Sequence, residues 1–282
     1  MNALEISNLT KRRGSFTLEG LDLTLPGGCI MGLIGDNGAG KSTTIGLILG
    51  MLKADGGTVR IFGRDSATLS ARDRADIGVV FDEACFTGCL NAGMLGRVMG
   101  GIYPRWDAAA YAQYLRRLDV PADKAFKELS RGNRMKLSIA AALSHGARLL
   151  ILDEATSGLD PVVRDEFTDI LCEFTRDEDH SVLMSSHIVS DLEKTCDYIA
   201  FLHQGRLMLC EEKDRLYEKY GVLRCTAAEA QAIAPDAIVG RRDSAYGVEL
   251  LVAREAVPAG LMLGRASIED LFIFMAKEGA EK

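Results

Sequence analysis

The strongest constraint on the fold is a glycine-rich run that separates a strand pattern from a helix pattern. The run follows the apolar residues 29–34, opens an expected helix over residues 41–52, and consists of Gly35, Asp36, Asn37, Gly38, Ala39, Gly40, Lys41, Ser42 and Thr43. Its three glycines let the backbone turn with N–H groups pointing inward, and the helix adds the positive end of its dipole. This combination predicts a loop that holds a phosphate chain, with Lys41 reaching the β- and γ-phosphates and Ser42 holding Mg²⁺.

The remaining sequence alternates between strand and helix patterns, which is typical of an α/β fold. An antiparallel strand pair is expected over residues 3–9 and 16–25, and further strands over 58–62, 77–81, 149–152 and 181–185. Helices are expected over 91–103, 107–118, from Ser130 onward, and over 162–174, 188–196, 214–220 and about 268–276. This alternation implies a mainly parallel core sheet covered on both faces, beside an antiparallel β subdomain.

A domain boundary is expected near Gly221, which follows the helix pattern over residues 214–220 and could cap it. We therefore expect a main domain over residues 1–220, with a helical subdomain at about 84–146. A small α/β accessory domain is expected over residues 221–282, with short strands and a final helix. The sequence does not indicate the role of this accessory domain.

Two adjacent carboxylates end an apolar strand pattern downstream of the glycine-rich run. Asp153 and Glu154 directly follow the apolar residues 149–152. At the end of a buried strand, Asp153 is placed to bind Mg²⁺, and Glu154 could polarise an attacking water as a general base. The alternative is that the two acids are simply solvated loop residues.

A short segment upstream carries the resemblance to a known family. It contains Ser130, Arg131, Gly132 and Asn133 after Leu129, where Ser130 could act as an ordinary helix N-cap. Between the glycine-rich run and the paired acids, however, the segment resembles the signature of the ABC ATPases, whose commonest form is LSGGQ. In that family this surface completes the ATP site of the opposite subunit by contacting the γ-phosphate.

Two further motifs extend the resemblance, which covers about residues 3–212. Ser157, Gly158, Leu159 and Asp160 resemble the family's D-loop, which communicates across the dimer interface. His187 resembles the switch histidine that contacts the γ-phosphate. The resemblance implies a P-loop ATPase of the ABC type that uses ATP and Mg²⁺, with Lys41, Glu154 and His187 as its catalytic residues.

Three positions depart from the family pattern. Asp82 stands where the family normally has a glutamine that touches Mg²⁺; an aspartate could also bind Mg²⁺, or be a solvated loop acid. The aromatic residue that usually stacks on adenine is replaced by Arg13 or displaced to Phe16, and either could instead be a surface or core residue. Arg131 stands where glycine is commonest, and could bind phosphate or line the surface.

Composition and charge exclude several classes of protein. A net charge of −7 and a pI of about 5.3 give no attraction for nucleic acid. No apolar run reaches the roughly 18 residues that span a membrane. No secretion signal is evident, and the odd number of cysteines, seven, favours a cytosolic chain with reduced thiols.

The departures and the Ala155–Pro161 run resemble the bacitracin-resistance-like branch, which serves multidrug, antibiotic and peptide exporters. The resemblance implies a motor that pairs with a second nucleotide-binding subunit, as a homodimer or heterodimer, and powers a separate transmembrane permease from the inner face of the cell membrane. A soluble ABC ATPase that acts on ribosomes or nucleic acid is the alternative. A module without hydrolysis is disfavoured by the presence of Glu154 and His187.

Overall fold

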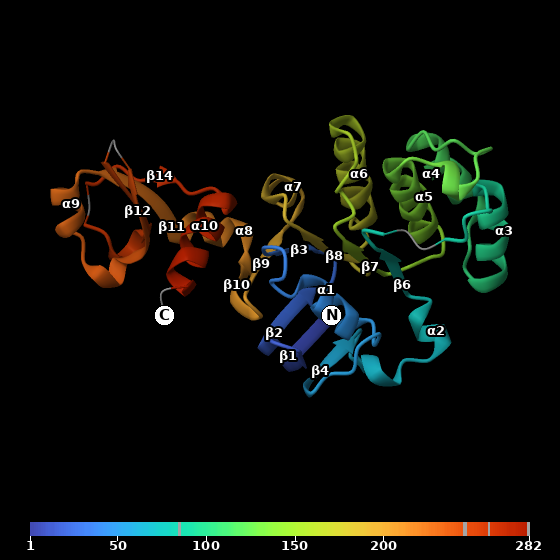
Figure 1. The fold of residues 1–282 in the computed structure, drawn as a ribbon, viewed down its shortest axis with the longest axis horizontal. Helices are drawn as coiled ribbons and strands as arrows, with labels where there is room; N and C mark the ends of the chain where they lie inside the picture. Colours follow the sequence, from blue (N-terminus) through green and yellow to red (C-terminus); the bar gives the residue numbers. More distant parts are fainter. Residues whose placement is uncertain (84–85, 245–246, 259, 281–282) are drawn as a thin grey trace.

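The computed structural model describes residues 1–83, 86–244, 247–258 and 260–280, and their side chains up to Lys277. Residues 84–85 of the expected helical subdomain and residues 245–246, 259 and 281–282 of the expected accessory domain lie outside the described residues. The described part of the chain forms three sheets flanked by helices. In Figure 1 the sheet near the N-terminus lies below the central sheet, and the sheet near the C-terminus lies toward one end of the long axis.

The central sheet confirms the predicted α/β fold with a mainly parallel core. Its strands lie in the order β10-β9-β3-β8-β7-β6, and all neighbours are parallel except β9 and β10. The strands are β3 (Ile30–Ile34), β6 (Ile77–Val80), β7 (Leu149–Asp153), β8 (Ser181–Ser186), β9 (Tyr198–His203) and β10 (Arg206–Glu212). The last two strands were not among the predicted elements.

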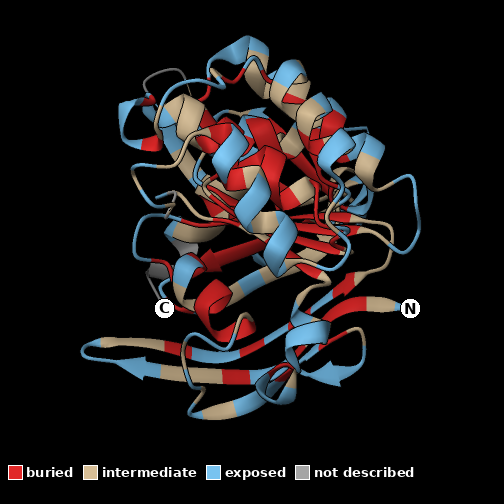
Figure 2. Ribbon diagram, turned by 90° about the vertical axis from the view of Figure 1, so that its right-hand side faces the viewer, coloured by how far each residue is buried: buried red, intermediate tan, exposed pale blue. Residues whose placement is uncertain are grey.

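The strands of this sheet divide their side chains between two hydrophobic cores. In β7, Leu150 and Leu152 belong to a core shared with the helices of the upper layer, whereas Leu149 and Ile151 belong to a core shared with the N-terminal sheet. Successive side chains of a strand point to opposite faces, so a continuous apolar run is required where both faces are covered. Figure 2 shows buried residues concentrated in this central layer.

The N-terminal sheet contains the predicted antiparallel strand pair. Its order is β2-β1-β4-β5, formed by β1 (Asn2–Arg13), β2 (Phe16–Pro26), β4 (Gly56–Ile61) and β5 (Arg64–Asp65). A short 3₁₀ turn (Ser66–Thr68) and α2 (Ala71–Arg74) follow. Helix α1 (Lys41–Ile48) lies between the two sheets (Figure 1) and is buried on several sides, as its apolar pattern predicted. It ends before the predicted residue 52 because Gly50 adopts a left-handed conformation with φ of 68°.

The helical subdomain consists of three helices beside the β6 edge of the sheet (Figure 1). They are α3 (Ala92–Ile102), α4 (Ala108–Arg117) and α5 (Arg131–Leu143), with a 3₁₀ turn at Phe126–Glu128. Each helix begins after a side chain that accepts a backbone N–H, from Asn91, Asp107 and Ser130 respectively. Such caps satisfy N–H groups that have no partner in the first turn, so polar residues fix where the helices start.

Two helices follow the strands that carry the candidate acids and histidine. Helix α6 (Pro161–Phe174) starts with proline at its first position after Asp160, whose carboxylate accepts the Val163 N–H at 3.0 Å. Helix α7 (Val189–Thr195) begins two residues after His187. None of the helices in the described ranges combines the length and the apolar character needed to cross a bilayer.

The C-terminal residues form a third sheet with the order β12-β13-β11-β14. Its strands are β11 (Tyr220–Cys225), β12 (Ile238–Ser244), β13 (Gly247–Ala253) and β14 (Gly264–Arg265). The shorter elements are α8 (Lys213–Lys219), α9 (Ala227–Gln231) and 3₁₀ turns at Pro235–Ala237 and Arg254–Ala256. The expectation that Gly221 caps a helix was wrong: Gly221 lies inside β11, paired with Val252 and Arg265.

Helix α10 (Ile268–Ala280) joins the third sheet to the central sheet. Phe274 is buried within the larger hydrophobic core, and the ring of Phe272 contacts that of Phe201 in β9 at 5.6 Å between centroids. A polar contact adds to this packing, because Glu193 of α7 accepts the Tyr217 hydroxyl at 2.8 Å and the Ile268 N–H at 3.4 Å. The C-terminal sheet is therefore attached through α10 to the helix that follows His187.

Candidate functional site

The glycine-rich run forms the connection between β3 and α1 that the sequence predicted. Gly38 and Gly40 have φ values of 85° and 114°, a region that other residues rarely adopt. A Cβ atom on Gly40 would lie 2.8 Å from the Phe16 ring, and one on Gly35 would lie 2.4 Å from the Leu202 carbonyl oxygen. Backbone conformation and close packing thus both require glycine, and the N-terminus of α1 opens directly at Lys41.

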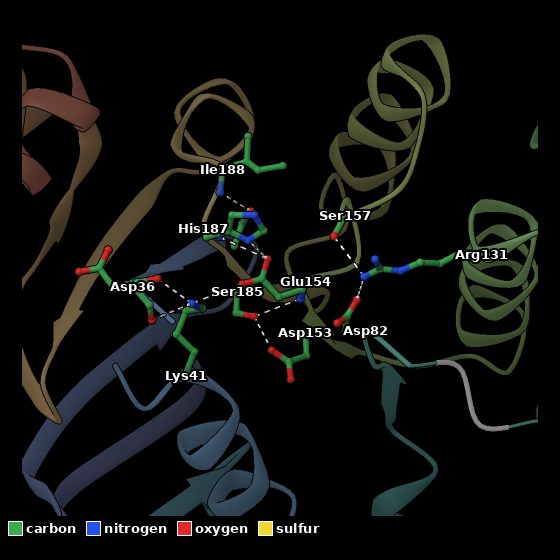
Figure 3. A network of polar contacts seen from close by, with 12 residues as sticks. Asp36, Lys41, Asp82, Arg131, Asp153, Glu154, Ser157, Ser185, His187 and Ile188 are labelled. Atoms are coloured by element: carbon green, nitrogen blue, oxygen red, sulfur yellow. Dashed lines mark hydrogen bonds and ion pairs between the residues drawn. The ribbon is translucent and has the colours of Figure 1, made fainter. Parts of the chain in front are cut away.

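The ammonium group of Lys41 lies at the centre of the site, with a side chain that is only 6% exposed. It donates to the carbonyl oxygens of Gly35 at 2.6 Å and Asp36 at 3.3 Å, and it lies 3.3 Å from Oε1 of Glu154. A buried ammonium requires such partners, because its transfer from water is costly without them. The loop and the candidate base are therefore held against each other through one cation (Figure 3).

The two adjacent acids point in different directions because the backbone turns between them. Asp153 is the last residue of β7, and its Oδ1 accepts the Ser185 hydroxyl at 2.6 Å. Glu154 has a left-handed conformation with φ of 52°, and its N–H bonds to the carbonyl and the hydroxyl oxygens of Ser185, both at 3.1 Å. A non-glycine residue in this region costs about 1–2 kcal/mol, so the bonds to Ser185 maintain a strained turn.

His187 completes a continuous network with Lys41 and Glu154. Its Nδ1 lies 2.7 Å from Oε2 of Glu154, and its backbone N–H donates to the same oxygen at 3.3 Å. The imidazole ring is half exposed, whereas the Glu154 side chain is 15% exposed. Both oxygens of the Glu154 carboxylate are therefore oriented, one by Lys41 and the other by His187 (Figure 3).

A cleft of about 420 Å³ brings most of the predicted binding residues together. Its lining contains Arg13, Phe16, Asp36, Asn37, Gly38, Gly40, Lys41, Ser42, Thr43, Asp82, Asp153 and Glu154. Both residues considered for stacking on a base lie in this cleft, and so do the three oxygen donors predicted for Mg²⁺. Hydroxyl and carboxylate oxygens are the ligands that Mg²⁺ prefers, usually together with water and phosphate oxygens, so this donor set fits the ion.

The signature segment lies beside this cleft, outside its lining. Ser130 caps α5 by accepting the Asn133 N–H at 3.3 Å, and its side chain is exposed. Arg131 forms an ion pair with Asp82 and donates to the Ser157 hydroxyl at 3.2 Å (Figure 3). The prediction that Arg131 binds phosphate or lines the surface did not anticipate this pair.

The D-loop segment packs against the start of α5. A Cβ atom on Gly132 would lie 2.9 Å from the Gly158 carbonyl oxygen, and Gly158 has a φ of 86°. Leu159 is buried, and Asp160 caps α6. Signature and D-loop segments therefore lie in contact within one chain, next to the residue at position 82.

Two polar residues of the site were not predicted. Ser185 contacts both Asp153 and Glu154. A hydroxyl residue at the end of an apolar strand pattern was the sequence feature that could have indicated this role. His203 ends β9 with its Nδ1 3.6 Å from Oδ2 of Asp36, in a strand that was itself not predicted.

The sequence matches a known protein family and several of its members. Residues 18–157 match the family model described as "ABC transporter". The chain is 31% identical to the uncharacterized ABC transporter ATP-binding protein YhcH of Bacillus subtilis, over 99% of this chain and 97% of YhcH. It is 35% identical to the daunorubicin/doxorubicin resistance ATP-binding protein DrrA of Streptomyces peucetius, over 82% of this chain and 72% of DrrA.

Two further similarities each cover about three quarters of the chain. The bacitracin transport ATP-binding protein BcrA of Enterococcus faecalis is 33% identical over 73% of this chain and 68% of BcrA. Among solved structures, an ATP-binding subunit of an ABC transporter superposes with a TM-score of 0.70 at 26% identity, over 77% of this chain and 92% of that one.

Proposed function

The chain belongs to the family of ABC transporter ATP-binding proteins, and from this premise we propose that it is the ATP-hydrolysing motor of an exporter for drugs or antimicrobial peptides. The family predicted from the five ordered motifs is confirmed, and ATPase activity is general among such cassettes. The contact of Glu154 with both Lys41 and His187 beside the phosphate-binding loop supports ATP hydrolysis, and the similarity to DrrA and BcrA supports export. The alternative partner, a ribosome or nucleic acid, is not favoured.

The geometry supports a direct hydrolysis mechanism. The γ-phosphate of ATP lies at the Lys41 ammonium, and Glu154 takes a proton from a water molecule as its oxygen attacks the γ-phosphorus. The bond from the γ-phosphorus to the bridging oxygen breaks, and ADP and phosphate leave. Mg²⁺, held by Ser42 and Asp153 with Asp82 nearby, would neutralise charge that develops on the phosphate oxygens. His187 holds the Glu154 carboxylate in place and contacts the γ-phosphate.

Completion of the site is proposed to require a second nucleotide-binding subunit. Residues 35–43 of one subunit and 130–132 of the other would hold each ATP in a head-to-tail dimer. Support comes from the exposed Ser130 at the N-terminus of a helix of 13 residues, whose positive end suits a phosphate from outside the chain. Hydrolysis would remove the bridging phosphate and let the subunits separate.

We propose the same division into two domains that the sequence predicts. Residues 1–220 would form the ATPase domain, with its helical subdomain at about 84–146, and residues 221–282 the accessory domain. A separate hydrophobic cluster within the third sheet, built around Leu223, Val248 and Leu250, supports this division. The packing of α10 on β9 supports an accessory domain that moves together with the ATPase domain.

The transmembrane subunit is proposed to dock on the helical subdomain, which places the motor at the inner face of the membrane. Met94, Val98 and Ile102 are exposed large apolar residues of α3, and a spacing of four places them on one face of the helix. Next to the end of this stripe, a groove of about 1110 Å³ runs between residues 71–76 and 102–105. An apolar stripe beside a groove suits an apolar helix of a partner protein.

Met94→Asp tests this docking surface. We expect at least a tenfold loss of affinity for the transmembrane subunit, because a charge would be buried in the interface. The ATP turnover of the isolated chain should stay unchanged. The measurement is pull-down and titration against the permease in detergent or nanodiscs. Met208→Asp is the matched control, since Met94 and Met208 are 42% and 39% exposed; equal binding by both variants would refute the proposed surface.

The proposed function itself is tested by reconstitution of the chain with its permease in proteoliposomes. ATP-dependent movement of a drug or an antimicrobial peptide out of the compartment that contains the ATPase supports an exporter. ATP hydrolysis without a membrane partner, together with co-purification of ribosomes, would instead support the alternative.

A further inference from the structure

Asp82 and Arg131, two of the residues that depart from the family pattern, contact each other. Asp82 follows β6 after Phe81, and Arg131 is the first residue of α5, 49 positions later. Their side chains are 44% and 59% exposed and form an ion pair (Figure 3). The two side chains carry opposite charges, which offset each other.

Asp82 lies where an additional negative charge matters for binding. It lines the same cleft as Asp36, Asp153 and Glu154, so four acidic residues line the space that a triphosphate would occupy. Lys41 also lines the cleft, but its ammonium group is already paired with Glu154, 3.3 Å away. Charges within a few ångströms interact strongly in a partly buried cleft, so an uncompensated Asp82 would oppose the entry of the phosphates.

Arg131 is held in position by a second polar contact and by the D-loop. Its guanidinium donates to the Ser157 hydroxyl at 3.2 Å. Its aliphatic part passes over Gly158, where an added Cβ atom would lie 3.5 Å from Cδ of Arg131. A planar guanidinium with several donors can serve two acceptors at once, whereas an ammonium on a flexible chain does so less well. Arg131 therefore links the segment after β6 to the D-loop.

We propose that Arg131 is a positioning residue that holds Asp82 at the edge of the nucleotide cleft and offsets its charge, so that MgATP can bind. This inference rests on the proposed function of the cleft and deepens it. It predicts that loss of Arg131 weakens MgATP binding much more when position 82 carries aspartate than when it carries asparagine, which keeps an oxygen that can face Mg²⁺. Charge balance between positions 82 and 131 would then be one determinant of the affinity for MgATP.

A double-mutant cycle on the full chain tests this coupling. The variants are Arg131→Ala, Asp82→Asn and the double variant, and the affinity for MgATP is measured by titration with a fluorescent ATP analogue at low salt. We expect Arg131→Ala to weaken binding about fivefold, within the range for coupled charged neighbours. Asp82→Asn added to Arg131→Ala should restore binding to within about twofold of the unaltered chain. In steady-state hydrolysis, Arg131→Ala should raise KM by about the same factor, and Asp82→Asn added to it should lower KM again.

The controls separate this coupling from general effects. Arg241→Ala removes another exposed Arg–Asp pair, with Asp243 in the third sheet, and should change neither constant. Thermal unfolding of each variant shows whether the fold is intact. Arg131→Lys keeps the positive charge, so it should lose less than half of the MgATP binding free energy that Arg131→Ala loses.

Three results would overturn the proposal. One is an Arg131→Ala defect that Asp82→Asn does not relieve, which would mean that Arg131 contacts the nucleotide itself. The second is an unchanged affinity in Arg131→Ala, and the third is a fall in kcat without a change in KM. If the unaltered chain binds no MgATP at all, the proposed function fails as well, and the two failures are thereby distinguished.

Discussion

Glu154→Gln is expected to lower ATP turnover by about 10²–10⁴-fold, the usual contribution of a general base. Glutamine keeps the shape of the side chain and can still contact Lys41 and His187, so the site should remain folded. It cannot accept the proton of the attacking water, because an amide is not basic. ATP should therefore bind to the variant without being hydrolysed, and the γ-phosphate should keep two subunits together.

Two measurements check this result. Phosphate release gives the turnover, and light scattering in the presence of ATP and Mg²⁺ gives the mass of the complex, which should be that of a dimer. Glu255→Gln, at an exposed glutamate in a 3₁₀ turn of the third sheet, is the matched control and should behave like the unaltered chain. Turnover by Glu154→Gln at the rate of the control would exclude Glu154 as the general base.

Lys41→Ala is expected to weaken ATP binding about 100-fold, equivalent to roughly 2.7 kcal/mol. The substitution removes a buried cation aimed at the phosphate chain, and bonds between charged groups are the strong ones in such a site. It also leaves Oε1 of Glu154 without its cation, so that the carboxylate adds to the repulsion of the phosphates.

Titration with a fluorescent ATP analogue measures this loss, and thermal unfolding shows whether the chain still folds. Lys53→Ala removes an exposed lysine just beyond α1 and is the matched control. ATP affinity that survives in Lys41→Ala would mean that the loop binds phosphate through its backbone N–H groups alone.

The parts of the fold that depend on short-range patterns were predicted well. The phosphate-binding loop, the Asp153–Glu154 strand end and the N-cap of α5 each involve residues within a few positions of one another. Such features depend on the residue types at neighbouring positions, which can be read directly from a sequence. The cleft then brings together predicted residues as distant as Lys41 and Glu154, because the parallel strands β3 and β7 end at one edge of the sheet.

Features that depend on tertiary packing could not be predicted in the same way. Gly221 follows a helix pattern, but it lies in a central strand, opposite Val252 on one side and Arg265 on the other, in a sheet whose strands lie 31 and 44 positions away in the sequence. The Arg131–Asp82 pair likewise spans 49 positions. The roles of the individual site residues remain predictions, to be tested by the variants above.

The strained backbone at Glu154 sets two requirements on position 154 against each other. Its left-handed φ of 52° suits glycine better than glutamate, and glycine would relieve roughly 1–2 kcal/mol of strain. Glycine would, however, leave the buried Lys41 ammonium without its carboxylate partner, and this loss offsets the relief of strain. The residue at position 154 is therefore a compromise, in which a strained backbone is the condition for placing one carboxylate between Lys41 and His187.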